Sequence, residues 1–382
     1  RRRHTRYGTV TGVQTCALPI SREYTFITPT PETISNFSEY VEYDYDETRN
    51  RYTIDPGEHW FFRERPDRPL LPPQFRFNWS SPFIISSNNS KRVFFGSNHL
   101  FKSDDRGDNW KIISPDLTTN DKSLRNTSDG GGLTNSNTGG ENHFTIITIS
   151  DTPIDKDVIW VGTDDGNVQV TIDNGDTWDN VRPNIVGVPQ KTWVSRVEAS
   201  KHKKGRAYVS FDNHRFDDNK PYVFMTDDYG KSWKNITSDL PKDYSVYVIK
   251  EDYIDENLLF VGTEKSVYFT INQGKIWEKL GSNLPSVAIH DLVIHPRDGD
   301  LIAGTHGKSI WILDDISPLR NLNFNSNKII PSRESTKWIK INTGRKQPYF
   351  EFRGENPPYG AIINFYSKTE IKGKITITNS SG

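Results

Sequence analysis

Four copies of one short turn motif constrain the fold of this chain more than any other feature. Each copy has Ser or Thr first, Asp or Asn two residues later, Gly two further on, and Trp three beyond the Gly. The copies are Ser103–Trp110, Thr171–Trp178, Thr226–Trp233 and Thr270–Trp277. Asp or Asn close to Gly favours a tight turn, because these residues tolerate left-handed backbone angles. The repeat therefore predicts a row of β-hairpins, each with a Trp at the start of its returning strand.

Within each copy, the Asp or Asn, the Gly and the Trp are expected to be structural. These residues are Asp105, Gly107 and Trp110; Asp173, Gly175 and Trp178; Asp228, Gly230 and Trp233; and Asn272, Gly274 and Trp277. Asn272 supports this interpretation, because a side chain that cannot ionise still makes the hydrogen bond of the turn. We expect the four Trp side chains to be largely buried.

A continuous apolar run precedes each motif. The runs are Arg92–Gly96, Val158–Thr163, Arg206–Phe211 and Leu258–Thr263, and a fifth, Leu301–Thr305, has no motif after it. Continuous runs are typical of strands covered on both faces. Trp110, Trp178, Trp233 and Trp277 are 68, 55 and 44 residues apart, and the last spacing is close to one four-stranded propeller blade. The sequence predicts an all-β chain of about five and a half four-stranded β-propeller blades.

We divide the chain into four segments. Residues 1–20 are unlike the rest and resemble a translated sequencing-adapter remnant, so they are left out of the fold prediction. Residues 21–74 are expected to form a partial blade and a connecting segment, residues 75–320 the propeller blades, and residues 321–382 the start of a C-terminal β-sandwich module. We expect the chain to be a piece of a longer protein, with upstream blades and the end of the sandwich missing.

Charge and composition narrow the function classes. The formal net charge is −1, and it becomes −5 without residues 1–20, because four arginines lie there. A mildly acidic chain gives no support to nucleic-acid binding. No long apolar run predicts membrane insertion in this fragment. The single cysteine, Cys16, lies in the first segment, and we expect no cofactor and no metal site.

Longer phrases resemble a family of large secreted bacterial proteins. The turn motif is similar to the Asp-box, or bacterial neuraminidase repeat, of sialidases, sortilin-type receptors and two-propeller glycosidases. Gly162–Val168, Asp212–Asp218, His290–Asp298 and Gly304–Asp315 resemble propeller proteins with a sortilin-like domain that are often labelled glycosyl hydrolases. The resemblance covers residues 75–377. It implies a secreted, periplasmic or cell-surface protein with a polysaccharide or protein ligand, but a fold does not fix a reaction.

Topology separates the candidate functional residues from the Asp-boxes. An Asp-box joins strands three and four of a blade, whereas the turns after strand two and the links between blades lie on the opposite face. On that face the ligand-binding candidates are Trp193, Arg196, His214, Arg215 and His306. The weaker catalytic candidates are Glu141, Asp165, Asp212 and Glu264, because a glycosidase needs two carboxylates flanking the scissile bond.

Each candidate also has a structural alternative. Asp165 precedes Gly166 in a tight turn, the charges of Asp212–Asp218 could form a salt-bridged loop, and single histidines such as His306 are usually packing residues. Residues 118–142 form a long polar loop that is either functional or disordered. We favour a glycan- or protein-binding scaffold, sortilin-like. The alternative is a glycoside hydrolase of the two-propeller type whose other propeller is missing here.

Overall fold

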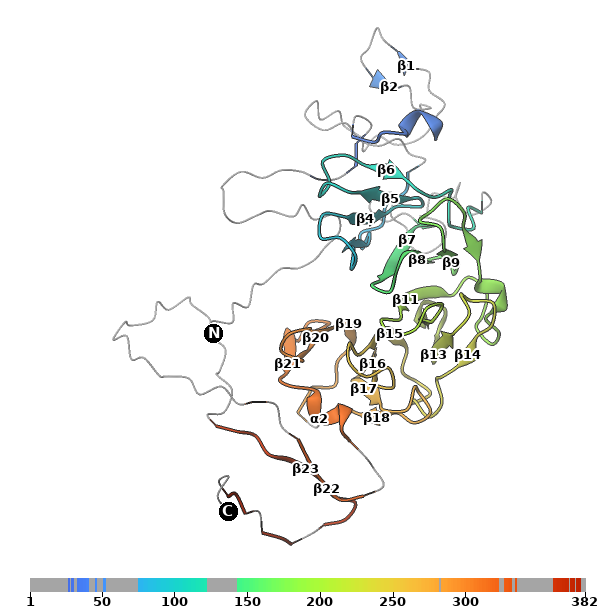
Figure 1. Ribbon diagram of the computed structural model, residues 1–382. Helices are drawn as coiled ribbons and strands as arrows, with labels where there is room; N and C mark the ends of the chain where they lie inside the picture. The colour runs from blue at the N-terminus through green and yellow to red at the C-terminus, as the bar shows by residue number, and fades with distance from the viewer. Residues whose placement is uncertain are drawn as a thin grey trace, which may run out of the picture. The chain divides into compact units, whose positions relative to one another are not determined.

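The computed structural model describes residues 75–121, 143–281 and 283–322, with shorter pieces between 27 and 52 and between 326 and 378 (Figure 1). Residues 1–20, most of the loop 118–142 and much of segments 21–74 and 321–382 lie outside the described residues. The chain divides into two compact units. Of the described residues, the larger unit holds those from 27 to 292 with 304–309, and the smaller holds 293–303 and those from 310 onward.

Four four-stranded antiparallel sheets, called blades 1 to 4 below, make up most of the larger unit. Blade 1 contains β3 (Phe83–Ile85), β4 (Val93–Gly96), β5 (Leu100–Ser103) and β6 (Lys111–Ile112); blade 2 contains β7 (Ile146–Thr152), β8 (Asp155–Thr163), β9 (Val168–Thr171) and β10 (Asp179–Asn180). Blade 3 contains β11 (Trp193–Ala199), β12 (Ala207–Asn213), β13 (Asp218–Thr226) and β14 (Lys234–Asn235); blade 4 contains β15 (Val246–Glu251), β16 (Leu259–Thr263), β17 (Val267–Thr270) and β18 (Glu278–Lys279). Each strand pairs with its neighbour in the chain, and each Asp-box joins the third strand to the fourth. The predicted all-β propeller fold is confirmed.

A fifth sheet, called blade 5, has three strands and no Asp-box. Its strands, β19 (Ile289–Ile294), β20 (Leu301–Thr305) and β21 (Ile310–Leu313), are divided between the two units. The remaining elements are η1 (Phe37–Glu39), β1 (Tyr45–Asp46), β2 (Arg51–Tyr52), η2 (Arg182–Asn184), η3 (His214–Phe216), α2 (Ser317–Arg320), β22 (Lys328–Ile330) and β23 (Asn364–Tyr366). β1 pairs with β2 and β22 with β23, both antiparallel.

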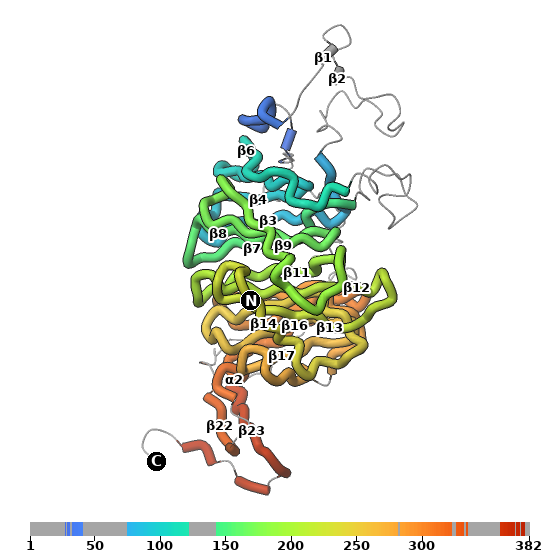
Figure 2. Tube along the Cα trace, turned by 90° about the vertical axis from the view of Figure 1, so that its right-hand side faces the viewer, coloured from blue at the N-terminus to red at the C-terminus, as the bar shows by residue number. Residues whose placement is uncertain are grey.

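The middle strands of a blade bury both of their faces. On β8, Ile159 and Val161 lie in the core shared with blade 1, whereas Val158 and Trp160 lie in the core shared with blade 3. Alternate side chains of a strand point to opposite faces of its sheet. A continuous apolar run therefore fills two cores at once. Within the larger unit, blades 1 to 4 follow one another in chain order (Figure 2).

A glycine near the end of the second strand allows the next blade to approach closely. A Cβ placed on Gly162 would lie 2.4 Å from Val194 on the first strand of blade 3. A Cβ on Gly96 would lie 2.9 Å from Ile146, which occupies the same place in blade 2. Real Cβ atoms do not come so close to another heavy atom. Glycine at these positions therefore sets the spacing between neighbouring inner strands.

Each Asp-box closes its own turn with the same side-chain hydrogen bonds. In the second box, Thr171 Oγ1 accepts a hydrogen bond from Gly175 N at 2.9 Å and lies 2.7 Å from the Asp173 carboxylate. Asp173 also accepts a hydrogen bond from Thr177 N at 2.9 Å. In the fourth box, Asn272 Oδ1 accepts from the backbone in the same way. The amide can replace the carboxylate because only an acceptor oxygen is required.

Three Asp-box tryptophans also bind a backbone carbonyl of the chain segment that precedes their blade. Trp178 Nε1 donates to Ile113 O at 2.9 Å, and Trp277 Nε1 donates to Ile236 O at 2.9 Å. Trp110 Nε1 makes the equivalent bond to Ile27 O at 3.0 Å. The bonded residues are 83 positions apart in the sequence for Trp110, 65 for Trp178 and 41 for Trp277. Each of these boxes therefore joins its blade to the segment before it.

The four tryptophans are not equally buried. Trp110 and Trp277 are 1% and 5% exposed, as expected, whereas Trp178 and Trp233 are only partly buried. Trp233 also differs in its hydrogen bond, because its Nε1 donates to Gly230 O of its own box at 3.1 Å. Its ring packs edge-on against Trp160 instead of entering the core.

The buried indole of Trp277 predicts a large effect on stability. Trp277→Ala removes the ring from the core of blades 3 and 4 and leaves Ile236 O without its donor. Large-to-small aromatic changes in a core cost ~3–5 kcal/mol of unfolding free energy. Denaturant unfolding followed by far-UV circular dichroism measures this loss. Trp233→Ala is the matched control and should cost less; an equal cost for both variants would contradict the assignment.

The Asp173 turn predicts a pH-dependent contribution to stability. Hydrogen bonds from Thr177 and Thr171 lower the pKa of Asp173 to about 2. The ionised form is therefore favoured in the folded chain, and its contribution is lost as the pH falls from about 4 towards 2. Asp173→Asn should be less stable than the parent at pH 5, and the difference should shrink towards pH 2.

The reciprocal change, Asn272→Asp, is the control for this experiment. It should add a titrating group to the fourth box and make stability between pH 5 and 2 steeper. A stability difference for Asp173→Asn that stays constant across this range would show that the Asp173 charge contributes nothing.

Candidate functional site

One turn position is equivalent in all five blades and faces away from the Asp-boxes. It lies two residues after the small residue near the end of the second strand, and it is occupied by Asn98, Asp164, Asp212, Glu264 and His306. In blades 2, 4 and 5 its backbone N–H donates to the residue ahead of the first strand, at 2.9–3.0 Å. In blade 3 the corresponding residues, Trp193 and Asp212, are paired in the sheet. The fold therefore presents one variable side chain per blade on this face.

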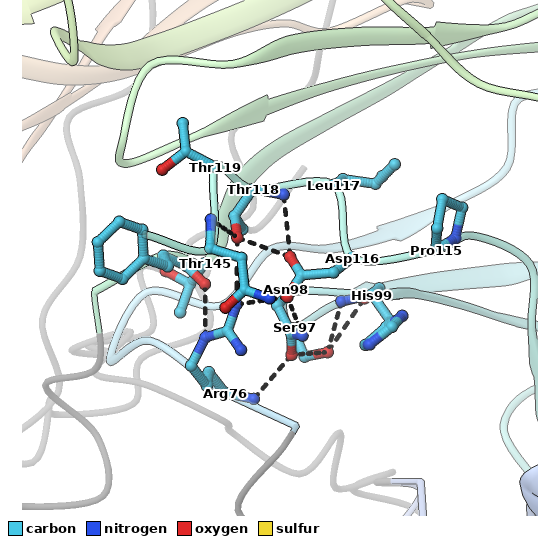
Figure 3. Close-up of polar contacts among 12 residues, drawn as sticks. Arg76, Ser97, Asn98, His99, Pro115, Asp116, Leu117, Thr118, Thr119 and Thr145 are labelled. Carbon is cyan, nitrogen blue, oxygen red and sulfur yellow. Dashed lines mark hydrogen bonds and ion pairs between the residues drawn. The ribbon is translucent and has the colours of Figure 1, made fainter. Parts of the chain in front are cut away.

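In blade 1 this position belongs to a buried structural network (Figure 3). Arg76 N donates to Asn98 Oδ1 at 2.8 Å, and Asn98 Nδ2 donates to Asp116 at 3.0 Å. Arg76, only 6% exposed, binds the same carboxylate at 2.7 Å and donates to Thr118 Oγ1 and Phe144 O. Burial acts to raise the pKa of Asp116, but the Arg76 guanidinium and the hydrogen bonds from Thr118 and Asn98 together outweigh it, and the pKa lies below its usual value. The polar groups of Arg76, Asn98 and Asp116 are therefore bound to one another, and they hold the link between blades 1 and 2 in place.

In blade 2 the two turn carboxylates are also engaged in internal contacts. Asp164 accepts hydrogen bonds from Thr145 N at 2.8 Å and from Thr145 Oγ1 at 2.7 Å. Asp165 accepts from Thr119 N at 2.6 Å and from the Thr163 hydroxyl. Both carboxylates are buried. Burial, followed by the nearby Asp164, raises the pKa of Asp165.

Blade 3 departs from this pattern, because Trp193 stands where blade 2 has Thr145. Without that hydroxyl, the buried Asp212 carboxylate pairs with its own loop: His214 Nδ1 lies 2.6 Å away and Arg215 Nη1 3.3 Å away. The Arg215 guanidinium lies over the Trp193 ring, 3.9 Å from the ring centroid. This is a cation–π contact. The 3₁₀ turn η3 ends at Asp217, whose φ of 58° is left-handed.

Blades 4 and 5 add a row of stacked rings. The Tyr247 ring stacks on His290, with ring centroids 4.6 Å apart, and His290 stacks on His306 at 5.2 Å. The Tyr247 hydroxyl donates to Glu264, and its ring meets the edge of His214 at 6.1 Å. Burial, then the bond to Glu264, raises the pKa of Tyr247; burial, then the neighbouring His306, lowers the pKa of His290.

These contacts connect residues of blades 3, 4 and 5 into one continuous group, called the ring cluster below. Its members are Trp193, Asp212, His214, Arg215, Tyr247, Glu264, His290 and His306. Arg196 adjoins it. The Arg196 guanidinium binds Asp291 at 2.8 Å and contacts His290 O at 3.4 Å. Arg196 therefore holds the start of β19, and with it the His290 ring, against blade 3.

The structure brings most of the sequence candidates together. Trp193, His214, Arg215, His306, Asp212 and Glu264 are in the ring cluster, and Arg196 is beside it. Asp165 is instead engaged between the turn of blade 2 and Thr119. Glu141 lies outside the described residues. Across residues 75–121, 143–281 and 283–322, no group of three or more His, Cys, Asp or Glu side chains is arranged to hold a metal ion.

Sequence reasoning missed Tyr247. Its signal lies in the repeat: Tyr247 directly follows Val246, the buried residue that starts the first strand of blade 4, as His290 follows Ile289 in blade 5. The sheet register shifts at this place in blade 4, so Tyr247 is a bulged residue. A bulge redirects a side chain out of the regular alternation of a strand.

No helix in the described part of the chain is long and apolar enough to cross a membrane. No curated protein sequence matches the chain significantly.

Solved structures similar to this chain include a GH74 xyloglucanase from Xanthomonas campestris, with 18% identity, a TM-score of 0.46, and coverage of 60% of this chain and 36% of that one. A GH74 enzyme from Niastella koreensis has 18% identity, a TM-score of 0.43, and coverage of 61% and 36%. YCF48 bound to D1 peptide has 21% identity, a TM-score of 0.33, and coverage of 41% and 47%. The chain thus spans less than half the length of each of these proteins.

Residues 221–370 match the family described as "Sortilin, neurotensin receptor 3". The matched segment includes two Asp-boxes and the four members of the ring cluster that come from blades 4 and 5. The expected resemblance is confirmed over residues 221–370, and the chain has the fold of an Asp-box β-propeller.

Proposed function

We propose that this chain is an extracellular ligand-binding scaffold whose ring cluster binds a polysaccharide or peptide chain. The observation that carries the proposal is the continuous contact of aromatic and imidazole rings from three successive blades on one face. The sortilin match supports it, because Tyr247, His290 and His306 all lie within the matched segment.

The arrangement of the rings suits binding. His214, Arg215, His290 and His306 are exposed, while Trp193 and Tyr247 are partly buried. Each ring is held by another ring, a cation–π contact, an ion pair or a hydrogen bond, so little side-chain freedom remains to be lost when a ligand binds. Rings with one polar edge provide contact area and hydrogen bonds together. A preorganised, solvent-facing surface of this kind favours a binding role.

Hydrolysis of a glycoside is the alternative function. It needs one carboxyl group as an acid and a second as nucleophile or base, about 5 Å apart for retention and about 6.5–9.5 Å for inversion. The Asp212 carboxylate is held by His214 and Arg215, and Glu264 accepts a hydrogen bond from Tyr247. Both carboxylates are thus used as acceptors for neighbouring side chains. This favours binding over acid catalysis at the ring cluster.

A glycan and peptide array tests the proposal. The full chain should bind at least one array ligand, and Trp193→Ala and Tyr247→Ala should each weaken binding by about tenfold or more, because central aromatic residues dominate binding energy. Ile276→Ala is the matched control, since Ile276 is exposed on the fourth Asp-box, on the opposite face. Binding that survives both ring variants and is lost with Ile276→Ala would overturn the proposal.

A further inference from the structure

We infer that the ring cluster selects polysaccharides that carry carboxylate groups over neutral ones, and that Arg215 binds the carboxylate. This inference rests on the proposed function, because it requires the ring cluster to be a ligand site. It adds the chemical class of the ligand and the residue that recognises it.

Arg215 is held in place without using all of its hydrogen-bond donors. Its guanidinium lies over the Trp193 ring, and its one ion pair among the described residues is the 3.3 Å contact with Asp212. An arginine has five N–H donors in a planar fork that can grip a carboxylate through two parallel bonds. The side chain is 35% exposed, so its other N–H groups can reach a ligand.

Two other arginines in the chain show how a guanidinium with a structural role is bonded. Arg206 pairs with Asp227 and Glu256, each at 2.6 Å, and its side chain is 6% exposed. Arg182 donates to the backbone carbonyls of Ile185, Val188 and Pro189 and is buried. Both of these arginines are structural. Arg215 differs from them in exposure and in having a single, longer ion-pair contact.

The carboxylates of the ring cluster, and Asp291 beside it, are already paired with protein groups. Asp212 has His214 and Arg215, Glu264 has the Tyr247 hydroxyl, and Asp291 has Arg196 at 2.8 Å. A cationic ligand would have to displace one of these partners. A carboxylate-bearing ligand can add to Arg215 without breaking any of them. The charge pattern of the site therefore favours an anionic ligand.

The backbone of this face favours a sugar chain over an extended peptide. Glu264 N donates to Ser245 O and His306 N donates to Ala288 O, while Asp212 pairs with Trp193 in the sheet. A peptide that binds as an added strand needs open backbone groups. A polysaccharide instead uses side-chain rings and hydrogen-bonding edges, which the ring cluster supplies.

Three acidic polysaccharides and their methyl esters provide the test. Binding of the full chain to polygalacturonate, alginate and hyaluronan is measured by isothermal titration calorimetry, with each methyl-esterified polymer as its neutral match. We expect at least one acidic polymer to bind about tenfold more tightly than its ester, with a difference that shrinks as salt is added. Arg215→Gln should remove this difference while leaving binding to the ester; Arg215→Lys should retain part of it. Thermal melting of each variant checks that the fold is intact.

The outcomes separate this inference from the proposed function. An acidic polymer and its ester that bind equally, with binding lost in Tyr247→Ala, would overturn the inference and leave the function standing. Preference for polyglutamate over all three polysaccharides would also overturn it, since the ligand would then be an acidic peptide. If Trp193→Ala and Tyr247→Ala bind every probe as well as the parent does, the ring cluster is not a site and both proposals fall. If no acidic polysaccharide is preferred over its ester, the inference is wrong.

Discussion

The contact between each Asp-box and the chain segment that precedes its blade is the interaction on which the rest of the structure depends. In the second box, Trp178 donates to Ile113 O, and a Cβ on Gly175 would lie 2.6 Å from the same oxygen. The box turn thus closes against the residue where the previous blade ends. The link that begins at Ile113 then runs to Thr119, whose N–H binds Asp165 on the opposite face. A turn on one face therefore fixes the start of a connection that ends on the other.

The same repeat explains where a binding site can develop. Positions that hold blades together keep one chemistry, such as a small residue (Gly or Ser) near the end of the second strand and Ser or Thr at the start of each Asp-box. The turn position after the second strand is free of that requirement. Blades 1 and 2 use it for buried networks around Arg76 and Thr145, whereas blades 3 to 5 use it for the ring cluster. Departure from the repeat, more than any single motif, marks the candidate site.

Much of the fold could be predicted from the sequence, because it depends on local patterns. Apolar runs gave the middle strands, and the Asp-box gave the hairpin between strands three and four. Trp178 and Trp233 are less buried than Trp110 and Trp277. This difference could not be predicted, because it depends on contacts with other blades. The same holds for the bulge that turns Tyr247 towards His290, and for the backbone N–H of Thr119 that engages Asp165. The site is made by contacts between blades that join residues about 30–100 positions apart in the chain, and sequence spacing does not report such contacts.

Hydrogen–deuterium exchange of the full chain, with and without a saturating acidic polysaccharide, tests most directly whether the ring cluster is a ligand site. We predict slower backbone exchange with the polysaccharide around residues 212–217, 245–247, 288–291 and 304–308, and unchanged exchange in the Asp-box turns. Protection confined to the Asp-box turns, with no change at those four segments, would contradict this prediction.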